Sequence, residues 1–223
     1  MDKETIQKFQ QKKHFYENVE TLENHLDKFF KKDEMVVFHE MLSLDFHLDV
    51  FFITPKEDDY NLLLTSGMSI LEMQVPESIS NKEDYRFAEL MLILPKEISF
   101  DKVIAADKNN GWIVDMLKET ARFPHHYDTF LSEGHSLQAT ADLQPYSEFT
   151  KFAACVILPS VTFDADFTEI QSPNGLINIY SLFPLYKNEL EYKLQNGYNK
   201  FLDLLINADA KEIFDNNRKN LLE

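Results

Sequence analysis

Three ionisable side chains recur at two-residue spacing in the segment LDFHLDV, namely Asp45, His47 and Asp49. The residues around them are apolar and complete an alternating pattern: Leu44, Phe46, Leu48, Val50 and Phe52. Because side chains two apart share one face of a strand, we expect a strand within residues 35–54 that presents the three groups together. Imidazole and carboxylate groups in one place could bind a metal ion or transfer protons. His47 and Asp49, together with His135, would suit a metal-dependent hydrolase, and the alternative for the three groups on the strand is a solvated polar face.

Standard catalytic signatures do not occur in the chain. The five glycines stand apart at positions 67, 111, 134, 175 and 197, so no glycine-rich loop can hold a phosphate. The sequence Gly67-Met68-Ser69 begins like a nucleophile elbow, but Leu71 occupies the position of its second glycine. A single cysteine excludes a zinc site built from cysteine pairs. We therefore expect a protein that is not an enzyme and holds no cofactor.

Cysteine usage and the N-terminal sequence favour a reducing compartment. Cys155 is the one cysteine, no Asn-x-Ser/Thr sequon occurs, and the first 20 residues are polar. The uncharged stretch 170–186 contains Pro173, Gly175 and Pro184, which excludes a membrane span of about 20 apolar residues. We expect a cytoplasmic protein in which Cys155 is a small buried side chain.

The chain is strongly acidic, with a formal net charge of −16. Residues 33–100 hold 14 acidic and 4 basic side chains, a net charge of −10, so the charge is concentrated there. Such a field repels nucleic acid and anionic membranes and attracts a basic protein. The carboxylates that we expect to contact a partner are Asp45, Asp49, Asp58, Asp59 and Glu72.

Hydrophobic periodicity predicts a mixed α and β chain. We expect helices over residues 3–31, 112–122, 184–195 and 198–206, with the tail 207–223 loose or helical. We expect further strands over residues 60–68, 85–94, 153–163 and 176–183. Glu89 lies inside the apolar run 85–94, so its charge must be paired, exposed or functional.

Several short motifs occur in a fixed order and together resemble the suppressor of fused family over residues 35–206. They are His47-Leu48-Asp49-Val50, Thr65 to Ser69 with Met73 and Val75-Pro76, Ala88-Glu89-Leu90-Met91 with Leu94-Pro95, Trp112, Leu117, Ala121-Arg122, Gly134-His135-Ser136, Phe183-Pro184-Leu185, Glu189-Leu190 and Gly197. The motif residues that we expect to have a structural or functional role are His47, Gly67, Met68, Ser69, Pro76, Glu89, Pro95, Trp112, Arg122, Gly134 and His135.

The resemblance implies an α+β fold, a mixed and mainly antiparallel sheet flanked by helices, like the N-terminal domain of the family. We expect a single domain over residues 1–223, with an N-terminal helix (1–32), the family core (35–206) and a C-terminal tail (207–223). The animal protein has a second domain and clamps a zinc-finger transcription factor of the Hedgehog pathway. This chain resembles only the first domain, so we do not transfer that partner.

Stand-alone bacterial members of the family include immunity proteins of polymorphic toxin systems. The resemblance therefore implies a non-enzymatic protein that binds and neutralises a cognate toxin, and the acidic charge favours a toxin domain with a basic surface. The alternatives are a metal-dependent hydrolase, a small-ligand-binding protein, and a scaffold or dimerisation module. The sequence leaves the oligomeric state open.

Overall fold

The computed structural model describes residues 3–43, 45–104 and 109–223, and Leu44 of the predicted strand lies outside them. The strands are β1 (Met35–Phe38), β2 (Asp49–Ile53), β3 (Tyr60–Ser66), β4 (Phe87–Pro95), β5 (Ser136–Gln138), β6 (Phe152–Leu158), β7 (Glu169–Ser172) and β8 (Gly175–Tyr186). The helices are α1 (Lys3–Gln11), α2 (Glu17–Leu26), α3 (Phe100–Ile104), α4 (Gly111–His126), α5 (Ala165–Thr168), α6 (Lys187–Asn196) and α7 (Tyr198–Asn207). Short 3₁₀ turns are η1 (Lys32–Glu34), η2 (Met68–Ile70) and η3 (Lys82–Tyr85).

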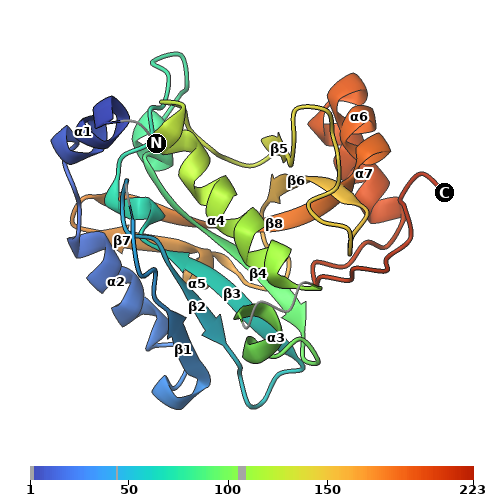
Figure 1. Cartoon of the computed structure of the whole chain (residues 1–223), viewed down its shortest axis with the longest axis horizontal. Helices are drawn as coiled ribbons and strands as arrows, with labels where there is room; N and C mark the ends of the chain where they lie inside the picture. The colour runs from blue at the N-terminus through green and yellow to red at the C-terminus, as the bar shows by residue number, and fades with distance from the viewer. Residues whose placement is uncertain (1–2, 44, 105–108) are drawn as a thin grey trace.

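Within the described ranges the strands form an eight-stranded sheet in the order β1-β2-β3-β4-β8-β6-β5, with β7 paired to β8 (Figure 1). The β4–β8 pair is parallel, and the other pairs are antiparallel. Helices flank the sheet, so the predicted α+β class with a mixed, mainly antiparallel sheet is confirmed. No helix in the described ranges is both long and apolar enough to cross a membrane.

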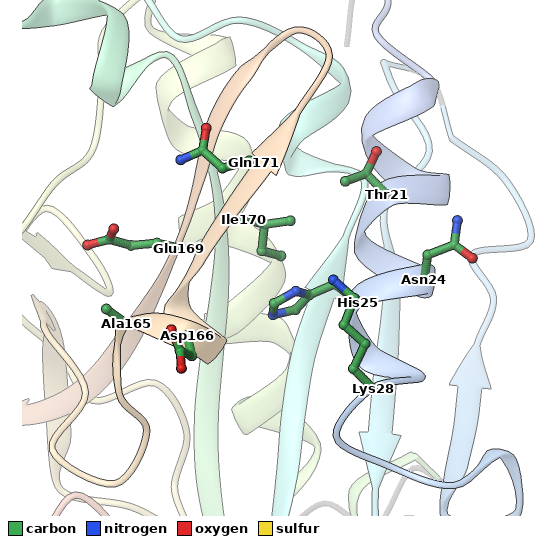
Figure 2. Close-up of a pocket in the computed structure, with 9 residues that line it drawn as sticks. All are labelled: Thr21, Asn24, His25, Lys28, Ala165, Asp166, Glu169, Ile170 and Gln171. Carbon is green, nitrogen blue, oxygen red and sulfur yellow. The ribbon is translucent and has the colours of Figure 1, made fainter.

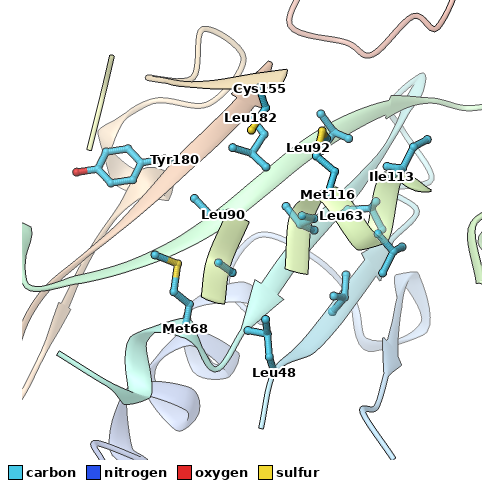
Figure 3. Packing of buried hydrophobic residues seen from close by; sticks show 14 of the residues in the cluster. Leu48, Leu63, Met68, Leu90, Leu92, Ile113, Met116, Cys155, Tyr180 and Leu182 are labelled. Carbon is cyan, nitrogen blue, oxygen red and sulfur yellow. The ribbon is translucent and has the colours of Figure 1, made fainter. Parts of the chain in front are cut away.

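Both faces of the central strands are covered, which explains the long apolar run of β4. On one face α4 packs over alternate residues such as Leu90 and Leu92, together with Cys155 of β6 (Figure 3). On the other face α2 and α5 cover Met91 and Ile93. Helices α6 and α7 cover the part of that face built by β6 and β8.

The prediction of one N-terminal helix was wrong, because α1 and α2 are separate. Phe9 of α1 is buried in the core beneath α4, whereas Phe15 is buried with α2 in the core on the opposite face. The Phe15 N–H also donates to the Ile70 carbonyl at 2.8 Å. The chain must leave the helix between these two residues in order to reach both cores.

The predicted ends of two C-terminal elements were also wrong. Pro184 was expected to open a helix, but it lies inside β8, and its carbonyl accepts a hydrogen bond from Arg218 at 2.8 Å. Since the N and the carbonyl of one strand residue point to the same edge, the missing N–H of Pro184 costs no sheet hydrogen bond.

The tail is not helical, yet Phe214 is buried beside Trp112, so the tail is packed.

Candidate functional site

The segment expected as a strand around Asp45 is a loop, named here the 39–48 loop, between β1 and β2. An ion cluster attaches this loop to α4. The Arg122 guanidinium lies 2.6 Å and 2.7 Å from the two carboxylate oxygens of Glu40 and 3.2 Å from Asp45 Oδ2. Lys118 lies 3.0 Å from Glu40, and His126 Nε2 lies 2.8 Å from Asp45. These contacts draw the loop away from the sheet edge, which is why the predicted strand begins only at Asp49.

The carboxylates of the ion cluster are ionised groups held by cations. Burial raises the pKa of each of the Glu40 and Asp45 carboxyls, but hydrogen bonds and charge outweigh it, so both pKa values are lowered. For Glu40 the opposing partners are Ser43, Lys118 and Arg122, and for Asp45 they include His126. The loop is therefore fixed by buried ion pairs rather than by strand pairing.

A second group of ionisable side chains lies at the exposed end of β1 and β2. His39 Nδ1 is 2.8 Å from Asp49 Oδ2, and His47 Nε2 is 2.7 Å from Asp49 Oδ1. The β1–β2 register pairs Phe38 with Val50, so one further step places His39 opposite Asp49. The structure thus keeps His47 and Asp49 together but adds His39 as the third member. Asp45 faces α4 instead, with its side chain only 4% exposed.

His135 does not belong to this group, so the predicted hydrolase set of His47, Asp49 and His135 is not assembled. The His135 ring packs edge-on against Phe130, and its Nδ1 accepts the Ser132 N–H at 3.3 Å. Burial lowers the pKa of His135. Its contacts are those of a packed side chain near β5.

The tip of the 39–48 loop carries an apolar pair that points into solvent. Met41 and Leu42 are 93% and 90% exposed. Adjacent exposed apolar side chains are candidate contacts for a partner, whereas single exposed apolar residues are ordinary. Sequence reasoning missed this pair because the alternation of Leu42 with Leu44 and Phe46 indicates a strand with a buried face rather than a loop.

The five predicted partner-contacting carboxylates do not share one surface. Asp49 pairs with Ser66 at one end of the β2–β3 hairpin, whereas exposed Asp58 and Asp59 lie in the turn at its other end. Seven residues of β3 separate these ends by roughly 20 Å. Glu72 is occupied by Arg86, with contacts of 2.7 Å and 2.9 Å. These carboxylates therefore do not form one continuous acidic face, and their contact with a partner stays a prediction.

Glu89 lies in β4, and its carboxyl group is fully buried. It accepts hydrogen bonds from the backbone N–H groups of Gly67 (3.0 Å), Met68 (3.3 Å) and Ser69 (2.9 Å). The hydroxyls of Thr65 and Ser69 donate to it at 2.6 Å and 2.7 Å. Burial raises the pKa of Glu89, and the donors oppose that shift. The role of Glu89 is to cap η2 and fix the β3–η2 turn.

Gly67 lies where this turn meets the 39–48 loop. Its φ is +125°, and an added Cβ would approach the His47 carbonyl oxygen to 2.3 Å. The absence of a side chain thus lets the backbone of the turn touch the loop. The carbonyl of Met68 accepts a hydrogen bond from buried His125 at 2.9 Å, and burial lowers the pKa of that histidine to about 3. The turn therefore joins the loop to α4.

The remaining motif residues have structural surroundings. Trp112 stacks on Tyr146 with ring centroids 5.7 Å apart and is part of the core beneath α4. Pro95 ends β4, and the Pro76 carbonyl accepts the Ile79 N–H in an exposed turn. At Gly134, with φ +82°, an added Cβ would meet the Tyr198 ring at 3.0 Å.

A polar groove of about 480 Å³ lies between α2 and β7 (Figure 2). Its lining residues include Asn24, His25, Lys28 and Glu169. His25 lines it from α2, and its Nε2 is 2.9 Å from the Phe167 carbonyl. Burial lowers the pKa of His25, and its contact with the Phe167 carbonyl opposes that shift. The groove offers a place for a small polar ligand but gathers no nucleophile with a base.

Comparisons with known proteins identify the family of the chain. The family model described as suppressor of fused protein (SUFU) matches residues 45–219, most of the chain. The chain belongs to the suppressor of fused family. A comparison with curated proteins gives no match.

Solved structures of the family show the same fold. A suppressor of fused homologue from Neisseria gonorrhoeae is similar with a TM-score of 0.65 and 17% identity, covering 91% of this chain and 95% of that one. Sufu from the Sufu–Fu complex gives a TM-score of 0.63 and 13% identity, with coverage of 95% and 94%. Drosophila Suppressor of Fused gives 0.59 and 13%, and the match covers 95% of this chain but 52% of that one.

Proposed function

We propose that the chain is a non-enzymatic protein-binding module, an immunity protein that binds and neutralises a basic toxin domain of a bacterial polymorphic toxin system. The observation that carries the proposal is the tip of the 39–48 loop. Met41 and Leu42 are almost fully exposed, while Arg122 holds the loop through Glu40. The ion pairs of Glu40 and Asp45 fix residues on both sides of the tip, which lowers the conformational entropy that a partner would have to remove.

The family and the charge support a protein partner. One similar structure is Sufu in complex with Fu, so that relative binds a protein. The net charge of −16 favours a partner of opposite charge. Basic surfaces are common among toxins that act on nucleic acids, because such surfaces bind phosphates.

We expect the acidic turn and the loop tip to control different rate constants of binding. Asp58 and Asp59 lie in the turn between β2 and β3, far along the hairpin from Asp49, where the 39–48 loop ends. They act through the long-range field and set the association rate. Met41 and Leu42 would be buried in the complex and set the dissociation rate.

The test begins with capture of a partner from native lysate at low and high salt, followed by kinetics with the purified partner. Charge reversal of Asp58 and Asp59 to Lys should slow association at low salt and leave dissociation unchanged. Substitution of Met41 and Leu42 by Ser should raise the dissociation rate by at least about tenfold, because burying one such side chain is worth about 1.5–3 kcal/mol.

A matched control separates this loop from general surface hydrophobicity. Val161 and Ile206 are another exposed apolar pair, at 85% and 75% exposure, and lie near α7. Their replacement by Ser should leave both rates unchanged. Equal effects of the two double substitutions would contradict the assignment of the loop. Sedimentation of the free protein tests the dimerisation alternative, which predicts an average mass that rises with concentration.

A further inference from the structure

Two histidines and one carboxylate lie close together beside the tip of the 39–48 loop. The ligand-capable atoms of His39, His47 and Asp49 all lie within 4.8 Å of one another. The histidine side chains are 72% and 53% exposed, so neither ring is held there by core packing. Asp49 is 15% exposed and is fixed by the Glu40 N–H, which donates to its Oδ1 at 2.8 Å.

The three groups come from segments whose positions are set independently. The β1–β2 pairing ends at Phe38 and Val50 and places His39 next to its last pair, and pairing with Ser66 of β3 fixes Asp49. His47 lies between Phe46 and Leu48, which are buried to 2% and 0% exposure, so its backbone is anchored on both sides. The backbone at the site is thus positioned by the sheet and the core, and both histidine rings contact the Asp49 carboxylate.

We propose that His39, His47 and Asp49 form a binding site for a divalent first-row transition metal of the zinc class. Two imidazoles and a carboxylate are ligands that Zn²⁺ takes in sites with three protein ligands. Zinc bonds of about 2.0–2.2 Å place tetrahedral ligand atoms roughly 3.3–3.6 Å apart. The two His–Asp separations of 2.8 Å and 2.7 Å reach that range with small rotations of exposed side chains.

An outer shell also supports the site. The Ser43 hydroxyl lies 3.5 Å from His47 Nδ1, the ring nitrogen that does not face Asp49, and it donates to Glu40. Groups that contact the second nitrogen of a ligating histidine orient the ring. A fourth position faces solvent, because both rings are exposed, and is open to water or to a side chain of another protein.

The test is calorimetric titration of the full chain, stripped with EDTA and dialysed, with ZnCl₂. We expect one ion per chain, and we expect His39→Ala/His47→Ala to weaken affinity by at least about 100-fold, more than the 10–100-fold typical of outer-shell changes. His14→Ala is the control, since His14 contacts Tyr16 rather than the site. It should bind zinc like the unmodified protein.

Visible absorption of Co²⁺ added to the same proteins provides a readout of inner-shell coordination. The ligand-field bands should appear with the unmodified chain and His14→Ala and be absent with His39→Ala/His47→Ala. No stoichiometric zinc binding, or equal affinity of the double variant, would overturn the proposal. Circular dichroism checks that each variant is folded. His39→Ala alone perturbs the protein less than the double substitution, and it should also lose the ligand-field bands. These titrations use no protein partner, so their result is independent of the proposed function.

Discussion

Replacement of Arg122 by Met tests whether the ion cluster holds the 39–48 loop. The substitution removes the contacts to Glu40 at 2.6 Å and 2.7 Å and to Asp45 at 3.2 Å. Both carboxylates are largely buried, with side-chain exposures of 15% and 4%. Removing one partner of a buried ion pair costs about 3–5 kcal/mol. Lys118 and His126 remain as partners, so we expect a loss near 3 kcal/mol.

Urea denaturation followed by circular dichroism gives the free energy of unfolding. A loss of 3 kcal/mol corresponds to a decrease in Tm of about 6–12 °C for a chain of this size. Arg122→Lys keeps the charge but cannot contact Asp45 and Glu40 through two separate nitrogens, as Nε and Nη2 of Arg122 do. It should therefore lose less stability than Arg122→Met. Limited proteolysis should cut the 39–48 loop faster in Arg122→Met. A stability within 0.5 kcal/mol of the unmodified protein, with unchanged proteolysis, would refute the role of the cluster.

Three further perturbations test the buried polar groups. Glu89→Ala leaves five donors without an acceptor, so thermal denaturation should show a loss of at least about 3 kcal/mol. Arg218→Met removes the guanidinium 2.5 Å from fully buried Glu189, so urea denaturation should show a loss of about 3–5 kcal/mol and faster proteolysis of the tail. The folded-state pKa values of Glu40 and Asp45 are lowered, so ionisation of these groups stabilises the fold above their unfolded pKa values, which are near 4. This stabilisation is lost as the pH falls through the folded-state pKa values. The free energy of unfolding, measured across roughly pH 2–6, should decrease less with falling pH in Arg122→Met than in the unmodified protein.

The strands could be predicted where the hydrophobic pattern of the segment alone determined its structure. The apolar run of β4 reflects burial of both of its faces, which local sequence records well, whereas the alternating pattern over residues 44–50 falls mostly in the 39–48 loop. The single helix predicted over residues 3–31 was wrong because Phe9 and Phe15 belong to different cores. Periodicity shows that a residue is buried but not in which core.

The candidate site depended on contacts that sequence spacing could not show. Arg122 and Glu40 are 82 positions apart, so the pairing that turns the expected strand into a loop has no local signal. His39 could have been found, since a hairpin register that pairs Phe38 with Val50 brings it to Asp49. The exposure of Met41 and Leu42 follows from the loop and could not be predicted without it.

The most direct test of the proposed function is the dissociation rate of the purified toxin partner from two variants. We predict that Met41→Ser/Leu42→Ser raises this rate at least about tenfold, whereas Val161→Ser/Ile206→Ser leaves it unchanged. The same rate for both variants and the unmodified chain would contradict the claim that the 39–48 loop is the binding surface.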